Sequence, residues 1–263
     1  MSVKILSGKV FLLITGASRG IGRQIAISFG SILEEGSEIL LLATNLNALN
    51  ETAKNIPAKI TVNTVSIDLS KATKEELHDI VQGALKNSSL EKFDRVVVVH
   101  NVGSVGDVTR STNEMMDINI WHNYYNLNVF IPAILNGVIM EIFNESTKCE
   151  KIVINITSLF GIQPGKKLAY YCTGKAAREM FFKVFALENP QINVLNYSPG
   201  PIDTDMFHTI CDDIGDDETK KNFNELLAKR TVLTTEQTVS RLLKVLRDQK
   251  YKSGDHIDYY DDL

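Results

Sequence analysis

A continuous apolar run, residues 9–15 (KVFLLIT), leads directly into a segment with the pattern Gly16-x-x-x-Gly20-x-Gly22. A run of this length and composition is typical of a strand that is buried on both faces of a parallel sheet. Apolar residues then recur at helical spacing, and a second strand-like run follows at residues 38–43 (EILLLA). Glycines at a strand-to-helix turn let the backbone approach a pyrophosphate on the helix N-terminus. The segment therefore predicts a dinucleotide-binding βαβ unit, with a purely structural glycine turn as the alternative.

The remainder of the chain continues the alternation of strands and helices. Strand-like runs occur at residues 60–66, 95–100, 151–156 and 192–197, with a short tail at 256–260. Helical patterns cover residues 47–55, 73–87, 113–143, 168–187 and 235–248, whereas residues 202–233 are polar and loop-like with one helix near 219–229. The alternation predicts an α/β fold, a single-domain, doubly wound (Rossmann-type) parallel sheet with helices on both faces. Residues 1–263 are expected to form one domain.

Charge and cysteine content exclude several classes of partner. The net charge of -4 and the pI of about 5.8 argue against a nucleic-acid or anionic-membrane surface. The N-terminus lacks a signal or transit composition, and no uninterrupted apolar run reaches the roughly 20 residues that span a bilayer. Three widely spaced cysteines match no metal pattern. We therefore expect a reduced, cytoplasmic protein with no metal site.

The end of the second predicted strand reads Ala43-Thr44-Asn45 and contains no carboxylate. Folds that bind NAD usually place Asp or Glu there, where it holds the adenosine ribose hydroxyls. Arg19, inside the glycine turn, is available to a 2′-phosphate through charge-assisted hydrogen bonds. The sequence therefore favours NADPH/NADP+ over NADH, with Arg19 as a solvated surface charge as the alternative. Asp68 and Leu69 follow the third strand, where a carboxylate could meet the adenine amine or cap the next helix.

Tyr171 lies four residues before Lys175, which places both side chains on one face of a helix, whereas Tyr170 points away from Lys175. A nearby ammonium favours the phenolate, so we expect the pKa of Tyr171 to lie below its ordinary value of about 10. Such a group can donate a proton near neutral pH. Ser158 ends the fifth predicted strand and could donate to a substrate carbonyl, and Asn128 could hold a water of a proton relay. In isolation, the spacing fits an ordinary amphipathic helix equally well.

Together these motifs resemble those of the short-chain dehydrogenase/reductase family, over almost the whole chain. In that family an Asn-Ser-Tyr-Lys group reduces a carbonyl with hydride from NAD(P)H. The matching residues here are Asn128, Ser158, Tyr171 and Lys175. One departure is His100, which precedes Asn101-Val102-Gly103 where many members have Asn-Asn-Ala-Gly. The expected cofactor-binding residues are Gly16, Ala17, Ser18, Arg19, Gly20, Ile21, Gly22, Thr44, Asn45, Asp68, Leu69, Asn101, Lys175, Pro199 and Gly200.

Longer stretches resemble members of the family that reduce side-chain carbonyls of pterins with NADPH and are homodimers. These stretches are residues 101–108, 171–180, 195–206 and 252–261. The resemblance implies a pterin substrate held by Ser158, Tyr171, Gly200 and Asp258, with Asp258 accepting hydrogen bonds from the amino-pyrimidinone edge. It also implies that a loop and helix at residues 201–232 and the tail, residues 253–263, bind substrate. Those members have an arginine for the 2′-phosphate where this chain has Thr44, and without the resemblance Asp258 would be a surface charge.

Two other functions fit the same residues. The chain could be an NADPH-dependent carbonyl or dicarbonyl reductase of broader specificity, or a catalytically silent dinucleotide-binding sensor. The intact Ser158, Tyr171 and Lys175 argue against the sensor. In this family the helices at residues 113–143 and 168–187 commonly form the dimer interface, although core packing would produce the same apolar pattern.

Overall fold

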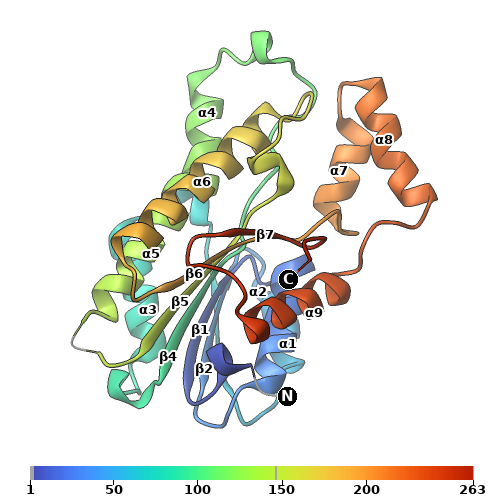
Figure 1. Ribbon diagram of the computed structural model, residues 1–263. Coiled ribbons are helices and arrows are strands. Elements are labelled where there is room, and N and C mark those ends of the chain that lie inside the picture. The colour runs from blue at the N-terminus through green and yellow to red at the C-terminus, as the bar shows by residue number, and fades with distance from the viewer. Residues whose placement is uncertain (1–2, 146, 263) are drawn as a thin grey trace.

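Seven strands of the described residues form one sheet in the order β3-β2-β1-β4-β5-β6-β7 (Figure 1). The computed structural model describes residues 3–145 and 147–262, so Met1, Ser2 and Leu263 of the predicted domain and tail lie outside the described residues. Every neighbouring pair is parallel, and the order reverses between β1 and β4, which confirms the doubly wound fold. The strands are β1 (Val10–Thr15), β2 (Glu38–Ala43), β3 (Thr61–Ser66), β4 (Arg95–His100), β5 (Glu150–Ile156), β6 (Asn193–Ser198) and β7 (His256–Asp258).

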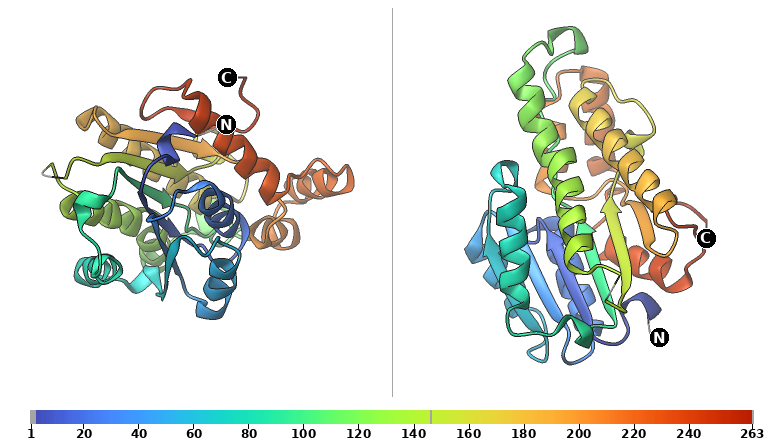
Figure 2. Two further views of the ribbon diagram at one scale, coloured as in Figure 1. Left: turned by 90° about the horizontal axis from the view of Figure 1, so that it is seen from below. Right: turned by 90° about the vertical axis from the view of Figure 1, so that its left-hand side faces the viewer.

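Helices cover both faces of the sheet (Figure 2). One face carries α1 (Gly20–Ile32), α2 (Leu46–Lys54) and α9 (Thr235–Asp248), and the other carries α3 (Lys74–Leu85), α5 (Ile131–Ile142) and α6 (Ala169–Glu188). Alternation along β1 explains the two layers: Leu12 and Ile14 pack into the core beneath α1 and α9, and Phe11 and Leu13 into the core beneath α3 and α5. The shortest helices are η1 (Lys4–Leu6), η2 (Leu69–Lys71), η3 (Leu90–Lys92), η4 (Thr112–Glu114) and η6 (Leu159–Gly161).

The segment predicted to be mostly loop holds two helices, and this prediction was wrong in part. The expected helix is α8 (Asp217–Ala228), but α7 (Asp205–Asp213) precedes it. The Thr204 hydroxyl caps α7 by accepting from the Phe207 amide, and Phe207 and Ile210 are buried. The acidic residues around these apolar positions hide the helical period.

At the other end of the chain, β7 stops at Asp258, two residues before the predicted end.

The predicted helical region at residues 113–143 contains α4 (Ile118–Tyr125), a π-helical segment, η5 (Asn126–Phe130), and α5 in one continuous run. By its length of 25 residues and mean hydropathy of 1.3, the run Ile118–Ile142 could cross a membrane. It instead packs along α3 and α6 as a core helix (Figure 2). Asparagines interrupt its apolar sequence, and two of them, Asn128 and Asn136, are buried. Length and hydropathy alone therefore do not identify its surroundings.

A buried carboxylate joins three elements on the side of the sheet that carries the tail. Glu179 of α6 accepts hydrogen bonds from the Thr157 hydroxyl at 2.7 Å and from Nδ1 of His256 at 2.9 Å, and it pairs with the Lys183 ammonium at 2.7 Å. Burial alone would raise the pKa of Glu179, but the bonds from His256, Lys183 and Thr157 outweigh it and lower the pKa from 4.5 to about 2. Ionised Glu179 thus fixes α6 to the end of β5 and to β7.

Replacing Glu179 by Gln tests this contact. Because the folded-state pKa lies below the unfolded value, the contribution of Glu179 is full above pH 4.5 and is lost as the pH falls toward about 2. We expect Glu179→Gln to lower the free energy of unfolding at pH 7 by roughly 2 kcal/mol and to flatten its dependence on pH in that acid window. Urea unfolding across that pH range measures both effects. Glu225→Gln, in an exposed pair with Lys229, is the control and should change little.

Candidate active site

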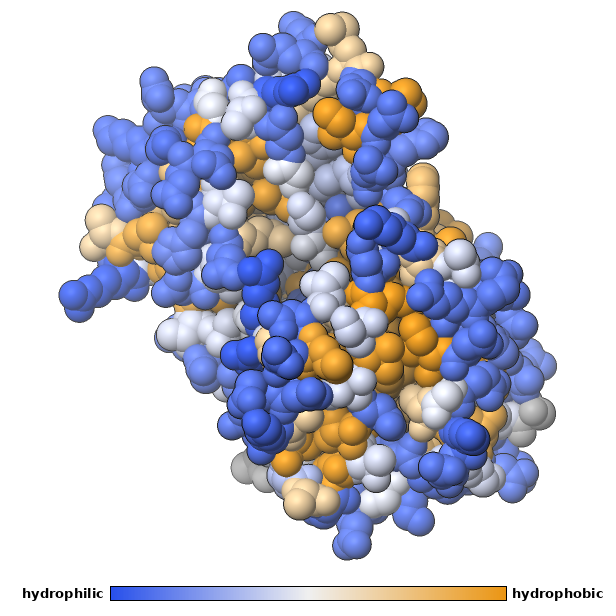
Figure 3. All heavy atoms as spheres, turned by 180° about the vertical axis from the view of Figure 1, so that it is seen from behind, coloured by the Kyte–Doolittle hydropathy of each residue, from blue (hydrophilic) through white to orange (hydrophobic). Residues whose placement is uncertain are grey.

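A cavity of 760 Å³ lies at the carboxyl edge of the sheet, where the glycine turn, the ends of β2 and β4, and α6 meet. From behind, it is the hollow in the middle of the surface, with apolar side chains exposed beside it (Figure 3). The predicted residues that line it are Gly16, Ser18, Arg19, Gly20, Ile21, Thr44, Asp68, Leu69, Asn101, Tyr171, Lys175 and Pro199. The predicted residues that do not line it are Ala17, Gly22, Asn45, Asn128, Ser158, Gly200 and Asp258.

The glycine turn is shaped to bring a ligand against the backbone. Gly16 and Gly20 have φ values of +68° and +55°, a region that favours glycine. A Cβ on Gly22 would lie 2.3 Å from the carbonyl oxygen of Gly16. Helix α1 begins at Gly20 and no side chain caps its first amides, so these N–H groups can bind an anion.

Asn101, at the end of β4, fixes this turn. Its side-chain amide donates to the carbonyl oxygens of Thr15 and Gly16, at 3.0 and 3.3 Å. The Thr15 hydroxyl in turn accepts from the amides of Asn101 and Val102, both at 3.0 Å. The glycine turn and the end of β4 therefore form one rigid unit, and Asn101 acts on the cavity through this turn as well as by lining it.

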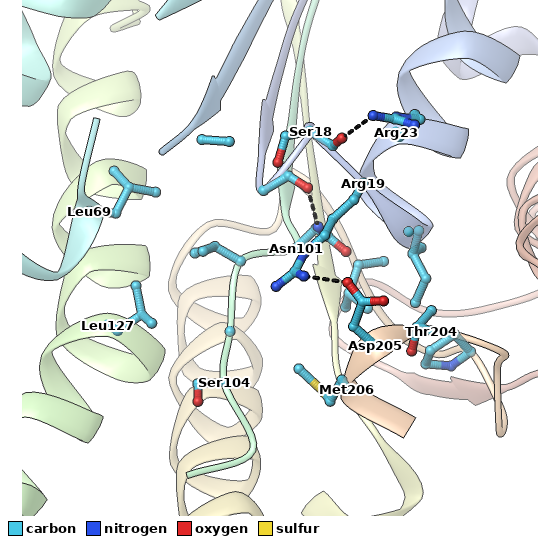
Figure 4. A pocket seen from close by; sticks show the side chains of 18 of the residues that line it. Ser18, Arg19, Arg23, Leu69, Asn101, Ser104, Leu127, Thr204, Asp205 and Met206 are labelled. Atoms are coloured by element: carbon cyan, nitrogen blue, oxygen red, sulfur yellow. Dashed lines mark hydrogen bonds and ion pairs between the residues drawn. The ribbon is translucent and has the colours of Figure 1, made fainter. Parts of the chain in front are cut away.

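Arg19 reaches from the glycine turn across the cavity to Asp205, the first residue of α7 (Figure 4). Both side chains of this ion pair are mainly exposed to solvent. Arg23, on the next turn of α1, also lines the cavity and was missed by the sequence analysis. Its guanidinium donates to the carbonyl of Ser18 at 2.5 Å and to the hydroxyl of Thr52 at 3.2 Å. The helical spacing from Arg19 to Arg23 was the signal that could have found it.

The residues predicted for the adenosine end are largely occupied by local hydrogen bonds. Asn45 caps α2 by accepting from the Ala48 amide at 3.0 Å. Asp68 caps η2, because it accepts from the amide and the hydroxyl of Ser70 at 3.1 and 2.6 Å. The hydrogen bond from the Ser70 hydroxyl is the largest of the effects that lower the pKa of Asp68. Asp68 therefore has the capping role that the sequence left open, while Thr44 and Leu69 face the cavity.

Tyr171 and Lys175 are both buried and line the cavity from α6, as their spacing predicts. The Lys175 ammonium lies 5.6 Å from the centroid of the Tyr171 ring and donates to the carbonyl of Ile156 at 2.7 Å. Ser158 caps η6, where its hydroxyl accepts from the Phe160 amide at 3.2 Å, and it lies near enough to Tyr171 to act on the pKa of that phenol. Tyr170 packs instead on Trp121, with ring centroids 4.4 Å apart. The fold thus brings Ser158, Tyr171 and Lys175 together and separates Tyr170 from them.

The prediction that Lys175 lowers the pKa of Tyr171 was wrong. Burial raises the pKa of Tyr171, and the hydrogen bond from Ser158 and the charge of Arg178 only partly oppose this. Burial, and then the charge of Arg178, lowers the pKa of Lys175 well below 10.5, with Glu179 acting in the opposite direction. The sequence pattern gives the distance between the two groups but not their desolvation, and here desolvation is the larger effect. Tyr171 is therefore held as a protonated phenol at neutral pH.

Asn128 lies in the π-helical segment, outside the main cavity. Its side-chain oxygen accepts from the Ser104 amide at 2.9 Å, and its side-chain nitrogen donates to the Tyr124 carbonyl at 2.8 Å. It lines a neighbouring cavity of 360 Å³ together with Ser104 and Tyr124. Both ends of the side-chain amide are therefore bonded to backbone groups, and its predicted part in a relay remains a prediction.

Asp258, at the end of β7, accepts from the Ser198 hydroxyl at 2.6 Å and from the Tyr260 amide at 3.1 Å. It is half-buried and stands beside the segment that contains Pro199 and Gly200. The parallel pairing of β6 with β7 places the C-terminal tail at the same edge of the sheet as the cavity. The tail is thus near the site, although Asp258 does not line the cavity itself.

An apolar wall surrounds Tyr171 on the side of α7 and α8. This wall could not be predicted from the sequence, because it forms only when the segment after β6 folds over the strand ends. Phe160 meets the Tyr171 ring edge-on at 6.4 Å and stacks on Phe223 of α8 at 6.3 Å. The other members of the wall are Val105, Val108, Leu168, Cys172, Met206, Ile210 and Ile214. Of these side chains only Met206 lines the cavity beside the phenol, and the others pack behind it.

Known proteins resemble the chain over most of its length. The short chain dehydrogenase family model matches residues 10–215. Sepiapterin reductases from Bos taurus and Xenopus laevis are each 33% identical to it, over 97% of this chain and 96% and 97% of theirs. A benzil reductase ((S)-benzoin forming) from Bacillus subtilis is 28% identical over 81% of each chain.

Solved structures show the same fold. A short-chain dehydrogenase/reductase from Saccharomyces cerevisiae superposes with a TM-score of 0.81 at 24% identity, over 97% of each chain. A short chain dehydrogenase from Shigella flexneri complexed with NADP superposes with a TM-score of 0.76 at 22% identity, over 98% of this chain and all of the other. At these identities the likeness concerns the fold alone.

The close approach at Gly22 yields a stability prediction. Gly22→Ala should destabilise the fold and weaken nucleotide binding by at least about tenfold, because the new methyl group collides with the rigid Gly16 carbonyl. Gly83→Ala, at a helical glycine with open space around its Cβ position, should instead stabilise the fold by roughly 0.5–1 kcal/mol. Thermal unfolding and fluorescence titration with NADPH measure both. If both variants had the same melting temperature and the same affinity for NADPH, the close approach of Gly22 to the Gly16 carbonyl would be contradicted.

Proposed function

This chain belongs to the short-chain dehydrogenase/reductase family and is an oxidoreductase, and we propose that it reduces the side-chain carbonyls of pterins with NADPH. The proposed reactions convert sepiapterin to dihydrobiopterin and 6-pyruvoyl-tetrahydropterin to tetrahydrobiopterin. One observation carries the proposal most directly: the glycine turn and the pair Tyr171 and Lys175 line the same cavity. A dinucleotide seated on the turn would extend along this cavity toward the phenol.

The residues present fit a nicotinamide dinucleotide. The free amides at the start of α1 and the glycine backbone suit a pyrophosphate, and a side chain at Gly16 or Gly22 would collide with Asn101 or with the Gly16 carbonyl and disturb this turn. Arg19 is the residue proposed to bind a 2′-phosphate, since Thr44 carries no charge. Its present partner is the exposed carboxylate of Asp205, and an exposed pair of this kind contributes little free energy, so a phosphate can compete for the guanidinium. This argument supports NADPH over NADH.

Proton transfer is the proposed task of the chain's own residues. The bound cofactor supplies the hydride that reduces the carbonyl carbon. Tyr171 gives its phenolic proton to the carbonyl oxygen, so that the carbonyl becomes an alcohol and a phenolate remains. The phenol is protonated before the step, and because burial raises its pKa, proton donation needs a group that stabilises the phenolate. Ser158, whose hydroxyl acts against the rise in the pKa of Tyr171, would hold the same oxygen.

Two features support a pterin as the substrate. Met206, from the apolar wall, lines the cavity beside Tyr171, and the tail places the Asp258 carboxylate at the edge of the sheet where the cavity lies. A carboxylate can accept two hydrogen bonds from the amino-pyrimidinone edge of a pterin. Asp258 would then exchange the Ser198 hydroxyl for the ligand. The sepiapterin reductases among the relatives support the same substrate class.

A homodimer is part of the proposal. The run α4–α5 and helix α6 lie side by side on one face (Figure 2). Large apolar side chains are exposed along them, which are Ile118, Phe130, Ile134, Met180, Phe181, Val184 and Leu187. A second copy would remove this apolar surface from water. The proposed location is the cytoplasm, whose reducing conditions suit three free cysteines among the described residues.

The proposed proton donor is tested by Tyr171→Phe, which removes the phenolic proton and keeps the ring. Turnover, followed as oxidation of NADPH in the presence of sepiapterin, should fall by at least about a hundredfold. The affinity for NADPH should change little. Tyr170→Phe is the matched control, because Tyr170 packs outside the cavity, and it should keep its turnover. Retained turnover in Tyr171→Phe would rule out the mechanism.

The main alternative is a reductase of broader specificity. Two observations favour it: one relative is a benzil reductase, and the Asp258 carboxylate already accepts hydrogen bonds from Ser198 and Tyr260 of this chain. Asp258→Ala separates the two functions. If Asp258 anchors the ring, the KM for sepiapterin should rise by about ten- to a hundredfold, while reduction of small dicarbonyls stays unchanged. Asp262→Ala, in the same tail, is the control. An unchanged KM for sepiapterin in Asp258→Ala favours the broader reductase.

A further inference from the structure

Arg178 is a buried arginine beside the proton donor, and neither the motif nor the proposed mechanism uses it. It follows Lys175 by three residues on α6, so the two side chains lie on one face of the helix. Its side chain is 1% exposed and is among the largest that are fully buried. The helix runs beside α4 and α5 (Figure 2), which closes this region from solvent on that side.

The guanidinium of Arg178 binds backbone carbonyls from three parts of the fold. One terminal nitrogen, Nη1, donates to Val102, just beyond β4, at 2.8 Å, and lies 3.5 Å from the carbonyl of Asn128 in the π-helical segment. The other, Nη2, donates to Ile156 at the end of β5 at 2.5 Å. The carbonyl of Ile156 also accepts from the Lys175 ammonium at 2.7 Å. Arg178 and Lys175 are therefore joined through one shared oxygen.

The charge of Arg178 has no carboxylate partner among the described residues. The neighbouring acid, Glu179, is bound instead to Thr157, Lys183 and His256. Within the described part of the chain, Nε of Arg178 also lacks a hydrogen-bond partner. Burying an unpaired cation is costly, and an apolar side chain of similar size would avoid that cost. Structural packing alone is therefore a poor explanation for an arginine here.

Several titratable groups face this charge. They are Tyr171 and Lys175 of α6, with Glu179 behind them, Tyr124 of α4 and His100 of β4. Burial, and then the charge of Arg178, lowers the pKa of Lys175 well below 10.5 and that of His100 to about 3. It also opposes the rise that burial causes in the pKa of Tyr171. Arg178 itself remains a cation at neutral pH, because burial lowers its pKa only to about 10.

We propose that Arg178 is a positioning residue for proton transfer: it holds the carbonyls that end β4 and β5 and sets a fixed positive charge beside Tyr171 and Lys175. The proposal rests on the proposed role of Tyr171 as proton donor. The shared carbonyl of Ile156 fixes the place of the Lys175 ammonium, and the unpaired charge stabilises the phenolate that forms as the proton leaves. Arg178 also lies 3.5 Å from the carbonyl of Asn128, the residue predicted to hold a relay water.

The sign of the charge effect is the same for both groups. Removing the positive charge at residue 178 disfavours the phenolate of Tyr171 and favours the ammonium of Lys175, so both pKa values rise. The alkaline limb of the pH–rate profile therefore moves to higher pH, whichever of the two coupled groups controls it. A residue that only supports the fold would change stability and leave this limb in place.

Two substitutions separate charge from geometry. Arg178→Gln removes the charge, and Arg178→Lys keeps it but cannot bridge two carbonyls in the same way. We expect kcat for NADPH-dependent carbonyl reduction to fall by about tenfold or more in both variants, because the donor is misplaced. Only Arg178→Gln should move the alkaline limb upward. Titration of ¹³C-labelled tyrosine by NMR, with the Tyr171 signal assigned through Tyr171→Phe, should show the same upward shift without substrate.

Arg95→Gln is the matched control, since Arg95 is a largely buried arginine at the opposite end of β4. It should lower the melting temperature and leave kcat and the pH profile unchanged. The proposal would be overturned if Arg178→Gln left both the alkaline limb of the pH–rate profile and the NMR titration of Tyr171 in place. Equal pKa shifts in Arg178→Gln and Arg178→Lys would overturn it as well. If only Arg178→Lys folds, a wild-type kcat in that variant also overturns it, and a tenfold loss at an unchanged melting temperature supports it. Retained turnover in Tyr171→Phe would instead refute the proposed function, and the NMR titration would still report on Arg178.

Discussion

The parallel direction of every strand in the sheet is the constraint on which the site depends. Parallel strands end at one edge, so segments far apart in the chain meet there: the glycine turn, Asn101, Ser158 and the segment after β6. The central strands, such as β1, β2 and β4, are buried on both faces, which requires helices on both sides. The chain leaves β1 toward one face of the sheet, where α1 lies, and leaves β4 toward the other face, where α5 lies. The helices therefore diverge between these two strands. The cavity lies in this gap, so its position follows from topology before any side chain is considered.

Helix α6 buries four ionisable side chains within a short stretch. In the nine residues from Tyr171 to Glu179 it buries a phenol, an ammonium, a guanidinium and a carboxylate. The cost of removing each group from water is offset in a different way. Glu179 takes three donors and ionises, Lys175 and Arg178 share a carbonyl, and Tyr171 stays protonated. Because these groups are desolvated, their mutual effects exceed what the same charges would produce in water. The helix is therefore an electrostatic unit as well as a packing element.

The other side of the cavity is built differently. Helices α7 and α8 fold over the strand ends, where Arg19 pairs with Asp205 and Lys166 with Glu218 at the surface, while Phe207 and Ile210 are buried. Such exposed pairs contribute little free energy each. The sheet and α6 carry the glycine turn and the proposed proton donor, Tyr171. The opposite side carries the apolar wall, whereas Asp258 lies on β7, which pairs with β6 and is held by Glu179 through His256.

The sequence by itself determined the fold class, the strand positions within about two residues and the pairing of Tyr171 with Lys175, because these depend on local periodicity and turn chemistry. Helix α7 was missed, since acidic residues mask its apolar positions. The pKa of Tyr171 was predicted to fall but is raised, because desolvation depends on elements that come from elsewhere in the chain. The Arg19–Asp205 pair, the apolar wall and the carbonyl cluster around Arg178 join residues far apart in sequence. Only the tertiary structure decided them, because spacing within a chain carries no information on which distant groups exclude water together.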